Sequence, residues 1–198
     1  MNQENNENYF KFEENNIGYT ITSYHRRGDA SITTIEIPAV YNEKPVTEIG
    51  NCGFLEATFL KSVFIPESIT QIGFEAFSCC ESLETIILPS GLTVILDECF
   101  SSCKSLQSIE IPEGVTEIGE YAFNSCYMLE RVTLPQSLKV IGQRVFSSDR
   151  NLLEIKLPDN LEELERDVFA NSEQVCVYYK GKTYTQNNMG DLYLLFQS

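Results

Sequence analysis

The chain has 198 residues, of which 42% are hydrophobic, and its 29 acidic and 14 basic side chains give a formal net charge of −15. This balance disfavours nucleic acid and anionic membranes as partners, because both are held by many Lys and Arg side chains. No apolar run approaches the roughly 18 residues that a membrane-spanning helix needs, so we expect a folded domain without membrane contact.

Residues 1–8 are polar and acidic, and we interpret them as a tail. They lack the basic and then apolar order of a secretory signal, which leaves two expectations: the chain stays in the cytoplasm, or a signal was removed from it. Strand-like segments around two turns follow, and they predict an N-terminal β cap over residues 9–31. The second turn contains Arg27-Gly28-Asp29, a tripeptide that integrins bind. A turn alone also accounts for its Gly and Asp, so both interpretations stay open.

A 23-residue repeat begins beyond this cap. Its prolines stand 23 residues apart, at Pro66, Pro89, Pro112, Pro135 and Pro158. Eleven residues after each proline stands a phenylalanine, at Phe77, Phe100, Phe123, Phe146 and Phe169. An earlier copy carries a five-residue insertion after Pro38, which we place in a surface turn. The period predicts six repeats over residues 32–180, and residues 181–198 are predicted to form a C-terminal cap.

Each repeat is expected to contribute one strand and one arc. In the strand, inward Ile86 and Leu88 alternate with outward Thr85 and Ile87, which is the pattern of a half-buried strand. The arc, residues 73–80, has small and large apolar residues at a spacing that suits a short helix or a 3₁₀ turn. Because one unit cannot bury its apolar face alone, we expect the repeats to stack and their strands to form a parallel sheet.

The pattern L-x-x-I-x-I/L-P-x-x-V/L-x-x-I-G-x-x-A-F-x-x-C resembles the BspA-like, or Treponema-type, leucine-rich repeat. The matching residues are Gly73, Ala76, Phe77, Cys80, Ile86, Leu88, Pro89, Gly119, Ala122, Phe123 and Cys126. The resemblance implies an α/β solenoid, a horseshoe-like superhelix with a parallel β-sheet on its concave face, short helical or 3₁₀ arcs, and β structure capping both ends. It also implies a secreted or cell-surface protein that adheres to host matrix proteins or to other microbes.

The seven cysteines predict packing rather than chemistry. No CxxC pair is present and His25 is the chain's one imidazole, so a zinc site has little support. Three cysteines share one repeat position, and we expect an inward ladder of reduced thiols that donate weakly to the turn backbone: Cys80, Cys103 and Cys126. In the last two repeats this position holds Asp149 and Ser172, a drift that fits the capped end of a stack.

Nothing in the sequence predicts catalysis. His25 beside a cysteine would make a nucleophile pair, but packing explains the repeat cysteines. Neither paired carboxylates at a distinctive spacing nor a glycine-rich phosphate loop is present. We therefore expect no enzyme activity, no cofactor and no metal site, and the resemblance implies the same.

The outward residues of the strands are the candidate binding face on the concave side. They are Glu36, Phe64, Ile87, Glu110, Arg131, Thr133, Lys156 and Tyr179. Phe64 and Ile87 form an apolar pair that is either part of an interface with a protein ligand or a contact that only stabilises neighbouring strands. The first interpretation predicts a protein-binding module. The alternative is a structural spacer or self-assembly domain that has no specific ligand.

Overall fold

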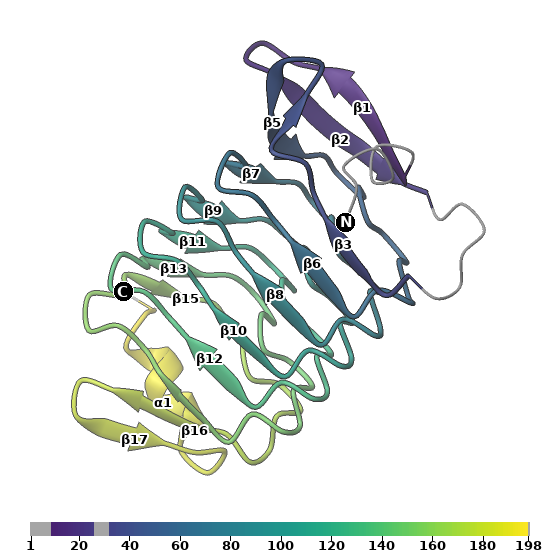
Figure 1. Ribbon diagram of the computed structural model, residues 1–198. Coiled ribbons are helices and arrows are strands. Elements are labelled where there is room, and N and C mark those ends of the chain that lie inside the picture. Colours follow the sequence, from purple (N-terminus) through teal and green to yellow (C-terminus); the bar gives the residue numbers. More distant parts are fainter. Residues whose placement is uncertain (1–8, 26–31, 198) are drawn as a thin grey trace.

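The computed structural model describes residues 9–25 and 32–197, and Figure 1 shows them as a stack of coils with parallel strands along its length. Each coil contributes one strand to each of two sheets. The parallel strands of the predicted solenoid are therefore confirmed, while its horseshoe curvature stays a prediction.

The long-strand sheet holds the strands that the sequence predicted. They are β3 (Thr34–Glu36), β6 (Ser62–Phe64), β8 (Thr85–Ile87), β10 (Ser108–Glu110), β12 (Arg131–Thr133), β14 (Glu154–Lys156) and β16 (Cys176–Tyr179). Residues 23 apart pair between β6 and β8 and between β10 and β12, as Val63 does with Ile86, whereas the paired residues are 28 apart between β3 and β6 and 22 apart between β14 and β16. The hydrogen-bonded strands fall into three groups: β3-β6-β8, β10-β12, and β14-β16 with β17. The sheet is therefore interrupted between β8 and β10 and again between β12 and β14.

The short-strand sheet was not predicted. It consists of two-residue strands at the fifth and sixth positions after each proline, namely β7 (Gln71–Ile72), β9 (Val94–Ile95), β11 (Glu117–Ile118), β13 (Val140–Ile141) and β15 (Glu163–Leu164). β9, β11, β13 and β15 pair in parallel in sequence order, and β7 pairs with β5 (Lys44–Ile49). Ile72, Ile95 and Ile118 are at most 1% exposed, so this sheet supplies a second inward row to the core.

The prediction that the arcs are helical or 3₁₀ is wrong, because no helix falls in the described part of the repeats. In the arc of residues 73–80, alternate amides leave the coil, and the N–H of Phe77 donates to the Cys99 carbonyl at 2.8 Å. Glu75 and Cys79 have φ angles of 52° and 58°. A right-handed helix cannot include such left-handed residues. The arc is thus a run of turns whose hydrogen bonds join neighbouring coils.

The core is organised around a stack of phenylalanine rings. One ring comes from each coil, and the six are Phe54, Phe77, Phe100, Phe123, Phe146 and Phe169. Neighbouring rings lie with centroids 4.9–5.9 Å apart and planes within 15° of parallel. Each ring is at most 1% exposed. The predicted phenylalanine column is therefore confirmed as the centre of the core.

Two hairpins build the N-terminal end. β1 (Phe10–Glu14) pairs antiparallel with β2 (Tyr19–Tyr24), and β2 runs parallel to β5. The Phe10 ring lies 6.0 Å from that of Phe54, so the first hairpin covers the end of the ring stack. The predicted insertion forms the second hairpin, in which β4 (Val40–Tyr41) pairs with β5. The tripeptide Arg27-Gly28-Asp29 lies outside the described residues.

The C-terminal end closes with a hairpin and a helix. β16 turns back through Lys180 and Gly181, whose φ angles are 47° and 74°, into β17 (Lys182–Tyr184). Two left-handed residues are what a two-residue hairpin loop requires. The helix α1 (Met189–Leu194) then packs its Met189 and Leu192 side chains inward.

The cysteine ladder is confirmed. The thiols of Cys80, Cys103 and Cys126 donate to the carbonyls of Phe54, Phe77 and Phe100 at 3.2–3.3 Å, each 26 residues back along the chain. Burial raises the pKa of Cys80 to about 12 and raises those of Cys103 and Cys126 as well. All seven cysteines of the protein are free.

Titration with a thiol reagent should therefore give two different counts. Protein prepared without reductant and then unfolded should show all seven thiols. In the folded protein Cys80, Cys99, Cys103 and Cys126 are buried and should not react, while Cys52, Cys79 and Cys176 are half-exposed and should. A thiol can react only when it reaches the reagent as thiolate. Fewer than seven thiols after unfolding would mean that disulfides form and would contradict the packing role.

Candidate functional site

The outward residues of the long-strand sheet form an exposed surface, which we call the strand face. Phe64 and Ile87 are paired across β6 and β8 and are 53% and 72% exposed. The residues between the outward ones are buried, since Val63 and Ile86 are only 2% and 7% exposed. The alternation along each strand therefore separates the core from the strand face, as the sequence predicted.

The other predicted site residues follow the same rule, with one exception. Those that lie exposed on the strand face are Glu36, Glu110, Arg131, Thr133 and Lys156. Tyr179 is wrong as an outward residue, because it is 4% exposed and Lys156 pairs with Tyr178 instead. The last coil is one residue shorter than the others between Val175 and β16, and a shift of one residue moves each side chain of a strand to the opposite face.

A hollow of about 480 Å³ opens on the strand face between β12 and β14. The residues that line it are Arg131, Val132, Thr133, Glu154, Ile155, Lys156 and Tyr178. It coincides with the second interruption of the sheet, where no strand pairing joins β12 to β14 in the described residues. Val132 is half-buried there, whereas Ile109 and Ile155 in the neighbouring coils are 3% and 2% exposed.

This hollow was not predicted from the sequence. Its outward residues Arg131, Thr133 and Lys156 were predicted as members of the face, but not as the lining of one depression. The available signal was weak: Val132 is smaller than the isoleucines at its repeat position. An interruption of strand pairing has no sequence pattern of its own.

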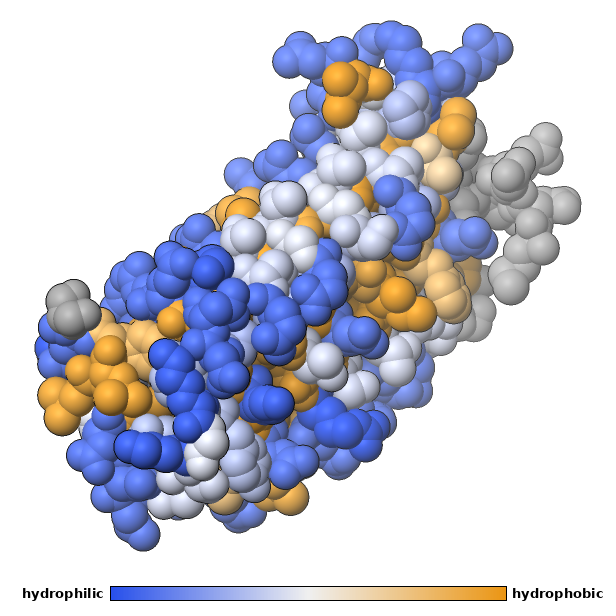
Figure 2. All heavy atoms as spheres, turned by 90° about the vertical axis from the view of Figure 1, so that its left-hand side faces the viewer, coloured by the Kyte–Doolittle hydropathy of each residue, from blue (hydrophilic) through white to orange (hydrophobic). Residues whose placement is uncertain are grey.

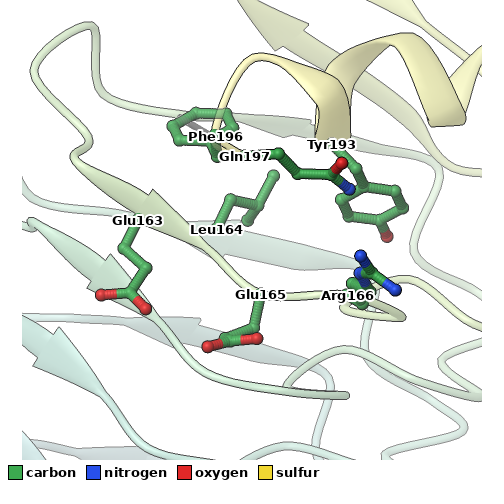
Figure 3. A pocket seen from close by; sticks show the side chains of 7 residues that line it. All are labelled: Glu163, Leu164, Glu165, Arg166, Tyr193, Phe196 and Gln197. Atoms are coloured by element: carbon green, nitrogen blue, oxygen red, sulfur yellow. The ribbon is translucent and has the colours of Figure 1, made fainter.

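A second hollow, of about 100 Å³, lies at the C-terminal end between β15 and the residues of and just after α1. Figure 3 shows Leu164 pointing toward Phe196 and Gln197, while Glu163 and Glu165 point away from them. This hollow is a gap in the packing of the end of the stack rather than a binding site of useful size. Beside it, Leu194 and Leu195 are 64% and 55% exposed, and Figure 2 shows a hydrophobic patch at this end of the molecule.

No group of three or more His, Cys, Asp or Glu side chains in residues 9–25 and 32–197 is arranged to hold a metal ion. Within the same residues, the helix is too short and too polar to cross a membrane.

Comparison with protein families identifies the repeat. A family described as "BspA type Leucine rich repeat region" matches residues 47–176 in six copies. The chain belongs to the BspA-type leucine-rich repeat family. Leucine-rich repeats of this kind are typically protein-interaction modules without enzymatic activity, and no enzymatic family is indicated for this BspA-type chain. A search of curated proteins found no match.

Solved structures of other leucine-rich repeat proteins share the fold. TpLRR of Treponema pallidum is 26% identical, and the match has a TM-score of 0.84 and covers 96% of this chain and 94% of that one. A leucine rich cell surface protein of Faecalibacterium prausnitzii is 27% identical, with a TM-score of 0.68, 89% of this chain covered and 54% of that one. A leucine-rich repeat protein of Bacteroides ovatus is 27% identical, with a TM-score of 0.63 and coverages of 86% and 51%. This BspA-type chain thus spans about half the length of the last two.

Proposed function

We propose that this chain is a non-enzymatic binding module that holds a protein partner on its strand face and acts as a secreted or cell-surface adhesin. The observation that carries the proposal is the Phe64–Ile87 pair, two large apolar side chains exposed side by side on β6 and β8. An exposed apolar patch that charged residues surround is typical of an interface. Glu36 and Glu110 flank the pair on the neighbouring strands β3 and β10.

The expected gain from covering this pair is large enough to matter. Full burial of a Phe or Ile side chain stabilises a complex by about 1.5–3 kcal/mol. Because Phe64 and Ile87 are 53% and 72% exposed, covering them gains about half to three-quarters of this figure for each, and the pair together still corresponds to more than tenfold in affinity. The flanking carboxylates would then orient the partner at the rim of the interface.

The proposed cell-surface location is supported by similarity to another leucine-rich repeat protein. The protein of Faecalibacterium prausnitzii that is 27% identical to this chain is described as a leucine rich cell surface protein. Host matrix proteins and the surfaces of other microbes are the partner classes that we propose to test first.

Self-assembly is the alternative function, and the exposed Leu194 and Leu195 at the C-terminal end favour it. An association through these leucines would leave the strand face free. Light scattering of the parent protein separates the two functions, because self-assembly predicts a mass above that of one 22.5 kDa chain in the absence of any partner.

The double variant Phe64→Ser with Ile87→Ser tests the strand face. Both side chains are exposed, so the free energy of unfolding should change by no more than about 1 kcal/mol. Binding to any ligand found in a screen of matrix proteins and glycans should weaken at least tenfold. Surface plasmon resonance on parent and variant measures this difference.

A matched control replaces two exposed apolar residues of the N-terminal hairpins. Ile17 and Val40 are 65% and 56% exposed, and the variant Ile17→Ser with Val40→Ser should bind as the parent does. If the control loses binding and the strand-face variant keeps it, the binding surface lies at the N-terminal end and the proposal fails.

A further inference from the structure

The cations of the described residues differ in whether they have a partner. Lys61, Lys104 and Lys139 each lie 2.6–2.8 Å from a glutamate of a neighbouring coil. Arg131 and Lys156, in contrast, have no carboxylate within ion-pair distance among residues 9–25 and 32–197, although the chain carries 29 acidic side chains. Both line the hollow between β12 and β14.

The rest of the hollow adds hydrogen-bonding groups and an apolar floor. Thr133 and Tyr178 bring hydroxyl groups to its rim, and Val132 and Ile155 form its base. β12 and β14 are not paired as strands in the described coils, so the hollow lies at a break in the sheet. Glu154 is the one carboxylate in the lining, so the two cations leave a local charge of +1.

We propose that this hollow binds an acidic side chain of the protein partner. A carboxylate can accept two parallel hydrogen bonds from the Arg131 guanidinium, and the Lys156 ammonium adds a second charge. This inference rests on the proposed function and names the chemistry of the partner.

The distance between the hollow and the Phe64–Ile87 pair sets the spacing of the contact residues in the partner. Neighbouring strands lie about 4.8 Å apart, so the hollow lies roughly 10–14 Å from Ile87. An extended segment rises about 3.3 Å per residue and covers this span with three or four residues. Glu110 lies between the two sites on β10 and repels an acidic residue there. The preferred segment therefore has an apolar residue, a neutral or basic stretch, and then Asp or Glu.

The test uses the full chain and a display library of random dodecapeptides as the probe. Peptides selected on the parent should be enriched in Asp or Glu placed three or four residues from an apolar residue. Their affinity should fall about tenfold or more for the variant Arg131→Gln with Lys156→Gln, because hydrogen bonds to charged groups are lost. The matched control is Arg166→Gln with Lys182→Gln, which removes the same charge outside the hollow and should bind as the parent does.

The outcomes separate this inference from the proposed function. A first outcome is a set of peptides that bind only when Phe64 and Ile87 are present, yet lack Asp and Glu and bind the variant Arg131→Gln with Lys156→Gln as tightly as the parent. That result would support the strand face as the binding surface and contradict the assignment of the hollow. Peptides that depend on neither pair would overturn both. If hyaluronate binds with dependence on Arg131 and Lys156 while no acidic peptide is selected, the hollow takes a glycan and its assignment to a protein segment is wrong.

Discussion

Replacement of Phe123 by alanine is expected to lower the free energy of unfolding by about 3–5 kcal/mol, the usual cost of removing a buried aromatic ring. Phe123 is fully buried, and its ring stacks between those of Phe100 and Phe146 with centroids 5.3 and 5.7 Å away. Neither neighbour can close the gap, because each is also held by the ring beyond it. The urea midpoint of parent and variant measures the change.

Phe64→Ala is the matched control for this experiment. It removes the same side chain from a position that is 53% exposed, and its cost should stay within about 1 kcal/mol. An equal shift of the urea midpoint in the two variants would contradict the assignment of the ring stack as the centre of the core.

Asp149 is the second residue for which we expect a large effect. It takes the cysteine position of the ladder, is 0% exposed, and accepts the Cys126 N–H on Oδ1 at 2.8 Å. Its Oδ2 has no partner. Burial is the main cause that raises the pKa of this carboxyl well above its usual range. Burial therefore favours the neutral form of the Asp149 carboxyl.

The ladder indicates where the acidic proton is directed. The ladder side chains donate to the carbonyl 26 residues back, and Ser172 does so to Phe146 at 2.7 Å. For Asp149 that carbonyl is Phe123, and no other hydrogen bond in the described residues ends on it. A protonated Oδ2 that donates to Phe123 satisfies both atoms, whereas an ionised one leaves them unpaired.

The variant Asp149→Asn is expected to stabilise the protein by about 1–3 kcal/mol at pH 7. Its amide can accept from Cys126 and donate to Phe123 without ionising. In the parent, the pKa of Asp149 is higher in the folded state than in the unfolded state, where it is near 4. The protonated carboxyl therefore contributes its full stability below about pH 4, and this contribution is lost as pH rises toward the folded-state pKa. The difference between variant and parent should therefore grow as pH rises from 4.

Unfolding midpoints of both proteins across this pH range give the measurement. Asp149→Cys is a second variant, since it restores the repeat residue, and it too should lack this part of the pH dependence. If the unfolding midpoints of the parent and of both variants change in parallel with pH, the pKa of Asp149 does not differ between the unfolded and folded states, and the assignment of a neutral acid is wrong.

The side-chain columns could be predicted because one period fixes them. The repeat phenylalanines, of which Phe123 is one, stand at a constant distance after the repeat prolines, and inward Ile86 alternates with outward Ile87. The core and the strand face therefore follow from hydrophobic spacing alone. The same spacing predicted the cysteine ladder. These features depend on residue type at fixed intervals, which is what a repeated sequence records.

The features that the sequence did not predict depend on the conformation and pairing of the backbone. Glu75 and Cys79 adopt left-handed conformations without being glycine or asparagine, so the arc seemed suited to a helix. Tyr179 was placed on the wrong face because one missing residue in the last coil leaves no mark in the apolar pattern. The hollow at Val132 depends on where strand pairing is interrupted, which side-chain type does not record.

Because β6, β8, β10, β12 and β14 recur every 23 residues, a duplication of 23 residues would add a coil without disturbing either end. A coil gained between Ile87 and Arg131 would move the apolar pair and the basic hollow apart by about 4.8 Å and leave the residues of each unchanged. A coil lost there would bring them closer by the same step. Descendants of such a gene could thus change the length of the segment they recognise in steps of one or two residues, with no substitution at either contact point.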